Sequence, residues 1–351
     1  MTLTNKLFAE IKTIPDILNV NYLPSLNGLR AISILIVIYR HTFWLHLKAD
    51  SFLNGDFGVT IFFVISGFLI TSLLLKEKVL KHHISLKSFF IRRALRILPL
   101  AYLYLIILLI LDGFGLITVP ISDYLSGFFY FNNWYTQTSY INHYWSLSVE
   151  EQFYLSFPFL LKYARLKHFI WVCILFLLAT PVITYMSQHQ VFLHEFFVAI
   201  LPLVKFHPII TGCLMAVVVF QQLIPFEKFT SVFVKLIILA IVIMTYKIAS
   251  PADINRVICP VFIAVFIVVN IYPKKDLIFW LLNSRLMNYI GLISYSLYIW
   301  QQLFTFNNMP WRDAFRYADS ALFNLSALFI VAYLSYTYFE KPFLSLKKKF
   351  V

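Results

Sequence analysis

The sequence is short of charged residues and of cysteine. Only 13% of its 351 residues are charged and 60% are hydrophobic, whereas about a quarter of a soluble domain is charged. That leaves too little polar surface to cover a water-soluble globule. Cys173, Cys213 and Cys259 are isolated in apolar runs, which excludes a disulfide framework and gives no metal-ligand spacing. We therefore expect a membrane protein with no metal and no bound cofactor.

The chain also lacks features that would indicate secretion or a second domain. Residues 1–24 contain no apolar core of a cleavable signal peptide. There is no internal repeat and no polar segment long enough for a separate soluble domain. The net charge of +13 could indicate nucleic-acid binding, but the basic residues lie between apolar runs, as in the loops of membrane proteins. We expect a lipid bilayer as partner and no nucleic acid.

What the sequence does contain is a series of apolar runs of about 20 residues, the length that a helix needs to cross a bilayer. They predict an all-α, polytopic membrane protein with about ten transmembrane helices. The run 196–222 contains Pro202, Lys205 and Pro208, so we expect a broken or re-entrant helix there. The predicted spans are 26–47, 58–75, 97–116, roughly 148–164, 169–187, 196–222, 230–248, 256–272, 286–304 and 318–339.

Basic residues are concentrated in the loop 76–96 and in the C-terminal tail. Because cytoplasmic loops are enriched in Lys and Arg, both termini are expected in the cytoplasm. The predicted organisation is a cytoplasmic segment 1–24, a transmembrane domain 25–343 and a basic cytoplasmic tail 344–351. A bacterial inner (cytoplasmic) membrane is the expected location.

The first apolar run, LRAISILIVIYRH, carries three ionisable side chains, Arg30, Arg40 and His41, and such residues are costly inside a membrane and usually functional. Arg30 and His41 are eleven residues apart, which places them on one helix face and about 16 Å apart along the axis. Arg30 then lies near the cytoplasmic end and His41 toward the outer leaflet. Histidine can act as a general base near neutral pH. The alternative is a structural polar pair bonded to neighbouring helices.

The stretch SFFIRRALRILP places Arg93 and Arg96 three residues apart, so they are neighbours on a helix surface. Guanidinium groups bind phosphate bidentately, and this pair could bind an anionic ligand at the cytoplasmic face. The alternative is a basic flank that sets topology and binds lipid headgroups.

The stretch NGDFGVTIFFVISGFLIT contains one acidic residue and one small polar residue of interest. Asp56 lies at the outer end of its span, where a carboxylate could orient His41; the alternative is a solvated loop aspartate. Ser66 is followed by Gly67 in the middle of the span, where small residues allow close helix packing.

The stretch NHYWSLSVEEQFYLSFP gathers polar side chains at the edge of a span, on the predicted outer side. His143, Trp145, Glu150 and Glu151 belong to it. Glu150 and Glu151 differ by about 100° around a helix, so at most one shares a face with a given partner. Ser148 and Glu151 also fit a capping box, which would make them only the start of a helix.

These motifs resemble the integral-membrane acyltransferase 3 family, in family order, from about Tyr22 to Phe343. Besides the stretches above, IGLISYSLYIWQQ and the terminal YFEKPF carry the resemblance. The resemblance implies transfer of an acyl group, commonly acetyl from acetyl-CoA, to a carbohydrate at or beyond the outer face. Typical acceptors in the family are O-antigen, exopolysaccharide, peptidoglycan and antibiotic sugars.

The resemblance also assigns residues. It implies an essential first-helix pair, an Arg-x-x-Arg pair and further functional positions, which are Arg30 and His41, Arg93 and Arg96, and Trp145, Glu150, Glu151 and Glu340. This chain departs from the family pattern twice. Thr60 stands where many members have aspartate, and Gln301 where many have histidine.

The hypothesis from the sequence is a membrane-bound O-acyltransferase. Arg30, Arg93 and Arg96 would bind cytoplasmic acyl-CoA. His41 would deprotonate a hydroxyl of a cell-surface or lipid-linked carbohydrate, which attacks the thioester directly rather than through an acyl-histidine. Glu151, Glu150 or Asp56 would orient the histidine. The competing hypotheses are a transporter of an anionic solute and a non-catalytic assembly partner that tolerates His41→Ala.

Overall fold

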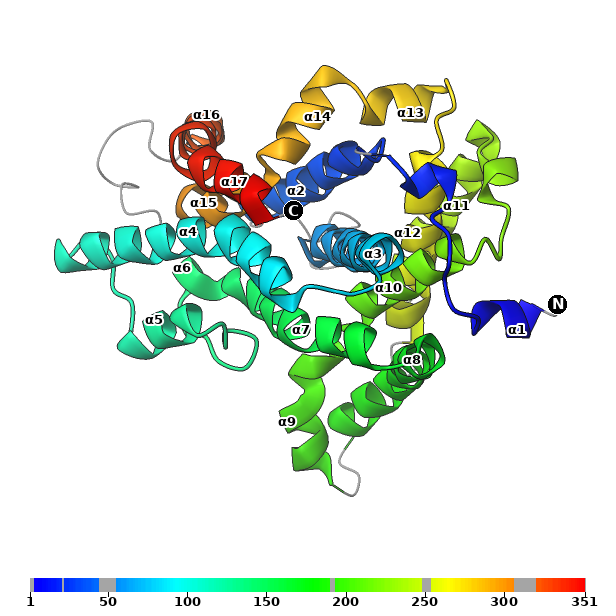
Figure 1. The fold of residues 1–351 in the computed structure, drawn as a ribbon. Coiled ribbons are helices and arrows are strands. Elements are labelled where there is room, and N and C mark those ends of the chain that lie inside the picture. Colours follow the sequence, from blue (N-terminus) through cyan, green and yellow to red (C-terminus); the bar gives the residue numbers. More distant parts are fainter. Residues whose placement is uncertain are drawn as a thin grey trace. The chain divides into compact units, whose positions relative to one another are not determined.

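The computed structural model describes residues 3–20, 22–43, 55–189, 193–247, 254–305 and 320–350. Within these ranges every regular element is a helix, and no strand occurs (Figure 1). This confirms the predicted all-α class. The chain divides into two compact units, which are described separately.

Unit 1 comprises Met1–Ser33, Asp50–Ile84 and Phe153–Gly291. It holds the first half of α2 (Leu26–Thr42), the second half of α7 (Tyr144–Tyr163) and most of α14 (Arg285–Leu292). Its other helices are α1 (Leu3–Leu7), η1 (Asp16–Leu18), α3 (Gly55–Lys81), α8 (Leu166–Gln188), α9 (His194–Val204), α10 (His207–Phe220), η3 (Phe226–Phe229), α11 (Val232–Lys247), α12 (Ile254–Ile271) and α13 (Leu277–Leu282).

Unit 2 comprises Ile34–Ala49, Ser85–Gln152 and Leu292–Val351. It holds the second half of α2 and the first half of α7. Its other helices are α4 (Leu86–Gly113), α5 (Ile121–Phe128), α6 (Ser139–Asn142), α15 (Ser294–Thr305), α16 (Ala321–Leu334), the π-helix η5 (Ser335–Glu340), α17 (Lys341–Leu346) and η6 (Lys347–Phe350).

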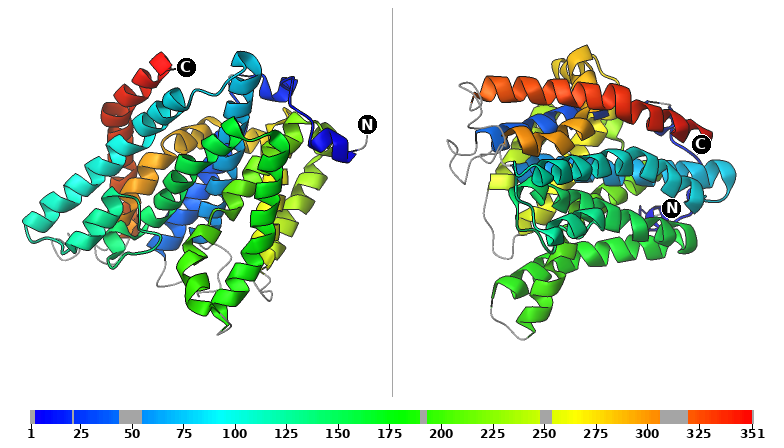
Figure 2. Two further views of the ribbon diagram at one scale, coloured as in Figure 1. Left: turned by 60° about the horizontal axis from the view of Figure 1, so that its bottom comes forward. Right: turned by 90° about the vertical axis from the view of Figure 1, so that its left-hand side faces the viewer.

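Five continuous helices of the described residues are long and apolar enough to cross a membrane. They are α3, α4, α8, α12 and the helix Ala321–Leu346. The pair α9 and α10 makes a sixth if it is one span, and it bends by 51° at the break between them. This confirms the break predicted within 196–222; α9 folds back beside α8 (Figure 2). The other predicted spans stay predictions. Residues 44–47, 248 and 318–319, at the ends of three predicted spans, lie outside the described residues.

In unit 1, α3 and α10 pack backbone against backbone. A Cβ added to Gly67 would lie 1.9 Å from the Ile209 carbonyl oxygen, and one added to Gly212 would lie 2.1 Å from that of Val64. Only glycine allows this approach, as is usual where membrane helices cross closely. The close packing predicted at Gly67 is therefore confirmed.

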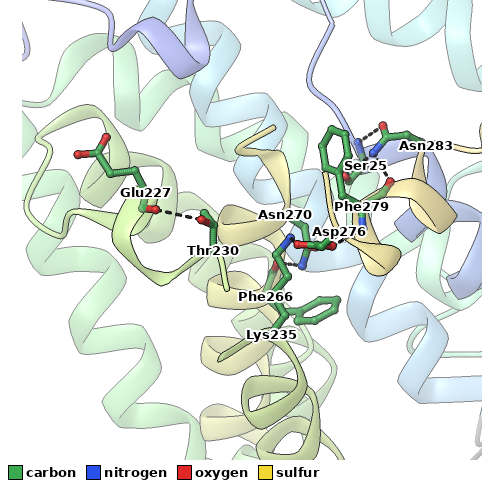
Figure 3. A network of polar contacts seen from close by, with 9 residues as sticks. All are labelled: Ser25, Glu227, Thr230, Lys235, Phe266, Asn270, Asp276, Phe279 and Asn283. Carbon is green, nitrogen blue, oxygen red and sulfur yellow. Dashed lines mark hydrogen bonds and ion pairs between the residues drawn. The ribbon is translucent and has the colours of Figure 1, made fainter. Parts of the chain in front are cut away.

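A buried polar network ties α11, α13 and the chain before α2 together in unit 1 (Figure 3). Lys235 of α11 is 0% exposed, and its ammonium lies 2.7 Å from the Asp276 carboxylate. Asp276 also caps α13 by accepting from the Phe279 backbone N–H at 2.8 Å. Asn283 accepts from the backbone N–H of Ser25 and donates to its hydroxyl, both at 2.9 Å.

The helix that carries Glu150 and Glu151 begins at Tyr144, four residues before Ser148, where the capping-box alternative would place its start. α7 starts at Tyr144, so Ser148 is inside the helix and cannot cap it. Its hydroxyl instead accepts from the backbone N–H of Asn132 at 3.2 Å. The capping-box interpretation of Ser148 and Glu151 is wrong, because a helix start depends on tertiary anchors such as this as well as on local sequence.

Candidate active site

The first-helix histidine meets an amide in unit 2. His41 lies in the last turn of α2, and its Nδ1 is 2.5 Å from Oε1 of Gln301 in α15. Gln301 is 0% exposed. When Nδ1–H donates to this oxygen, the lone pair of the neutral ring is on Nε2, which is the arrangement a general base needs.

A second histidine lies close to the first. His143 follows α6, is 3% exposed and interacts electrostatically with His41. Its ring makes edge-on contacts with Tyr104, Tyr144 and Tyr298, at centroid distances of 5.3, 5.0 and 5.7 Å. Burial, reinforced by His41, lowers the pKa of His143 well below its ordinary value, so its ring is neutral near pH 7.

Unpartnered polar atoms gather around these two histidines. The amide nitrogen of Gln301 and the indole nitrogen of Trp300 are buried without a hydrogen-bond partner, and the buried His143 ring has the Ile299 backbone as a polar neighbour. Trp300 packs against Tyr104, which contacts His143. Each buried polar group without a hydrogen bond costs about 1–3 kcal/mol. A cluster of them is expected where a ligand supplies the missing partners.

Tyrosine hydroxyls fix the frame around the histidines. Tyr298 of α15 bonds to the Ser146 hydroxyl at 2.5 Å and donates to the His143 carbonyl at 3.0 Å. Tyr144 donates to the Ala101 carbonyl of α4 at 2.7 Å. These bonds connect α15 and α4 to the start of α7, so the helix that carries Gln301 is held in register with His143.

The Arg-x-x-Arg pair faces two glutamates in the same unit. Arg93 interacts electrostatically with Glu151 of α7, and Arg96 with Glu340 of η5. Glu340 is buried and accepts hydrogen bonds from Ser296 and Ser335. The π-helix that carries it is a rare form found mostly at functional sites. Each of these two arginines therefore lies near a glutamate of another helix.

On α4, the two arginines lie at a different level from Tyr104, the residue that contacts His143. Arg93 precedes Tyr104, the residue in contact with His143, by eleven residues. On a helix this separation is about 16 Å along the axis. Unit 2 thus holds a basic site at one level and a histidine site at the other, connected by α4, α7 and α15.

The remaining predicted site residues have varied surroundings. Arg30 lies on α2 in unit 1, half-buried, and Asp56 is the second residue of α3 and interacts with Lys205. The Ser66 hydroxyl bonds to Tyr154 within unit 1. Trp145 and Glu150 are half-buried on α7, where Glu150 interacts with the neighbouring Glu151. Asp56 belongs to unit 1 and His41 to unit 2.

Sequence reasoning did not include Gln301, the hydrogen-bond partner that the structure gives His41. The expected carboxylate beside His41 stays a prediction, and Glu151, the first candidate, interacts with Arg93. The available signal was the Gln301-Gln302 pair inside a predicted span, since polar side chains in such a segment are rarely there without a role.

Comparison with known proteins identifies a family. The family model of the acyltransferase 3 domain, described as an acyltransferase domain, matches residues 23–340. The peptidoglycan O-acetyltransferase OatA of Listeria monocytogenes is 26% identical over 92% of this chain and 56% of its own length. The O-acetyltransferase OatA of Staphylococcus aureus is 38% identical over 44% of this chain and 27% of its own length.

The chain spans only about a quarter to just over half of the curated relatives that it matches. No solved structure matches it. The family match covers nearly the whole chain and includes every candidate site residue discussed above. The chain therefore belongs to the acyltransferase 3 family.

Proposed function

We propose that this protein is a membrane-bound O-acetyltransferase that moves an acetyl group from cytoplasmic acetyl-CoA to a carbohydrate hydroxyl, with His41 as general base. The observation that carries the proposal is the hydrogen bond from His41 Nδ1 to a buried, neutral amide oxygen. It supports a ring with its lone pair on Nε2, and unpartnered polar atoms lie around that ring.

In the proposed reaction, His41 Nε2 accepts the hydroxyl proton while the hydroxyl oxygen forms a bond to the thioester carbon. The tetrahedral intermediate collapses with cleavage of the carbon–sulfur bond. The leaving thiolate takes the proton from His41, which returns to its neutral state. The products are an O-acetyl ester and the thiol of CoA, and no acyl-histidine forms.

The arginines would hold the donor. Along α4, Arg93 lies about 16 Å and Arg96 about 12 Å from Tyr104, the contact of His143. Along α2, Arg30 lies about 16 Å from His41. A pantetheine arm is of that order of length. It would connect CoA phosphates at the arginines to a thioester at His41. This assignment requires the orientation expected from the basic loops, with about ten spans and both termini in the cytoplasm.

The acceptor would be a glycan on the outer side of a bacterial inner membrane. The printed name of the Listeria relative specifies peptidoglycan, which makes peptidoglycan the first acceptor to test. O-antigen and exopolysaccharide are the other acceptors of this class.

One feature favours a second function, transport of an anionic solute. The span made by α9 and α10 is bent by 51°, and Lys205 lies at the bend. Broken helices with a charge at the break are typical of transporters. A transporter would move its substrate unmodified and would not consume acetyl-CoA.

The test uses membranes that contain wild type, His41→Ala or, as a matched control, His83→Ala, which changes an exposed histidine. Each is incubated with acetyl-labelled acetyl-CoA and a peptidoglycan or total glycan fraction, and label in the glycan is counted. We expect transfer by wild type and His83→Ala, and a loss of at least about 100-fold for His41→Ala. Equal transfer by all three would refute His41 as the base. Uptake of an anion without transfer would favour the transporter.

A further inference from the structure

We infer that Gln301 is the positioning residue of the catalytic base: its amide oxygen selects the tautomer of His41 without placing a negative charge beside the ring. This inference rests on the proposed function. It concerns how His41 is tuned rather than whether it acts.

Gln301 is well placed for this role because it is buried and rigidly held. Its helix α15 is anchored one turn earlier by Tyr298, which bonds to Ser146 and to the His143 carbonyl. One turn later, the Thr305 hydroxyl donates back to the Gln301 carbonyl at 2.8 Å. The amide therefore meets His41 from a fixed direction, and its oxygen at 2.5 Å gives Nδ1–H one acceptor.

The chemistry of an amide differs from that of a carboxylate at this position. Both accept a hydrogen bond from Nδ1–H. A carboxylate would also stabilise the imidazolium and would thereby raise the pKa of His41 by about 1–3. Gln301 fixes the orientation and itself adds no charge beside the ring. His143 is coupled to His41 from a neighbouring element, and Arg40 adjoins His41 on its own helix.

A neutral base fits the second half of the proposed reaction. His41 must return its proton to the CoA thiolate after the carbon–sulfur bond breaks. An imidazolium paired with a carboxylate would release this proton less readily, because the ion pair stabilises it. An imidazolium hydrogen-bonded to an amide has no such ion pair with the amide and releases the proton more readily. Gln301 therefore keeps His41 able both to accept and to donate the proton at neutral pH.

The experiment compares three substitutions of Gln301 in the full-length protein. Gln301→Glu keeps the acceptor and adds charge, Gln301→Met removes the acceptor at similar volume, and Gln301→His offers a ring nitrogen as acceptor without a fixed charge. The matched controls are Gln221→Glu and Gln221→Met, because Gln221 is a buried glutamine that donates to the Ala9 carbonyl. Acetyl transfer is measured as kcat against pH, together with the melting temperature and acetyl-CoA binding.

We expect Gln301→Met to lose about 10²–10⁴-fold in kcat while it still binds acetyl-CoA, because the tautomer is no longer selected. Gln301→Glu should keep kcat within about tenfold at alkaline pH, with the acidic limb of its profile shifted upward by about 1–3 pH units. Gln301→His should stay active, which keeps the inference testable if the buried carboxylate prevents folding.

A packing role predicts the opposite order, because a buried methionine is tolerated better than a buried carboxylate. Folded Gln301→Met as active as Gln301→Glu, or an unmoved acidic limb, would overturn the inference. His41→Ala in the same assay separates the two possible failures. If it transfers as well as wild type, the proposed function itself falls. If transfer needs His41 but not Gln301, only the positioning role falls.

Discussion

Two buried polar clusters, one in each unit, differ in how completely their hydrogen bonds are made. In unit 1, the Lys235 ammonium meets the Asp276 carboxylate, and that carboxylate also caps a helix (Figure 3). In unit 2, the amide of Gln301 meets His41 with its oxygen only, and its nitrogen has no partner. The first cluster has nearly all of its hydrogen bonds made, with Oδ1 of Asn270 as an exception.

The difference indicates what each cluster is for. A polar network that satisfies itself adds no binding capacity and fixes the helices that contribute to it. A network with unused donors lowers stability, and it persists where a substrate completes it. The Lys235 cluster is therefore expected to control stability and the His41 cluster to control catalysis. Substitutions in each should affect one property and spare the other.

The largest expected effect on stability is at the ion pair. Asp276→Asn leaves the fully buried Lys235 ammonium without a counter-charge, which should lower the free energy of unfolding by about 3 kcal/mol. The double variant Lys235→Met with Asp276→Leu removes both charges and should recover most of that loss. Melting temperature in detergent measures both, with Asp16→Asn as an exposed control. An unchanged melting temperature for Asp276→Asn would break the contrast between the clusters.

The next effect concerns the donor site. Arg93→Gln should raise the KM for acetyl-CoA by about 10- to 100-fold with little change in kcat, because a charge-assisted contact to phosphate is lost. Arg92→Gln is the matched control, since Arg92 donates instead to the Phe350 carbonyl at 2.6 Å. A fall in kcat at unchanged KM would place Arg93 in the chemistry rather than in donor binding.

A smaller effect is expected from acid. Burial alone would raise the pKa of Asp276, but hydrogen bonds from Lys235 and the Phe279 backbone outweigh it and hold the pKa below its usual range. The native state thus binds the proton less readily than the unfolded state. The stabilisation is present above the ordinary aspartate pKa and is lost as pH falls through the lowered one. Melting curves from pH 6 to pH 3 should show this loss for wild type and not for the charge-free double variant.

The sequence predicted those features that depend on local pattern. Apolar run length indicated a helical membrane protein, and prolines near Lys205 indicated the bend between α9 and α10. Helical periodicity paired Arg30 with His41, and family motifs selected Arg93 and Arg96. Each of these inferences uses residues within one segment or one motif.

The partners of these residues could not be predicted, because no local rule connects positions far apart in the chain. Gln301 is 260 residues from His41. Lys235 looked like an ordinary residue of the run 230–248, yet it is fully buried against Asp276, 41 positions away. The expected carboxylate beside His41 followed from general chemistry and stays a prediction, whereas tertiary packing added an amide that the sequence did not indicate.

The smallest expected effect on stability is also the sharpest test of the contrast. His143→Phe removes two buried ring nitrogens that make no well-formed hydrogen bond, with the Ile299 backbone as a polar neighbour, and keeps an aromatic ring among Tyr104, Tyr144 and Tyr298. Replacing an unsatisfied polar group with an apolar one of similar shape is neutral or stabilising. The free energy of unfolding should therefore stay the same or rise by at most about 1 kcal/mol, and the melting temperature should not fall. Acetyl transfer should fall at least tenfold, because polar groups retained at a cost to stability are expected to contact substrate.

His168→Phe, on α8, is the control. If His143→Phe instead lowers the melting temperature and leaves transfer intact, the ring is a structural part of unit 2, and unpartnered atoms no longer distinguish the catalytic cluster from the structural one.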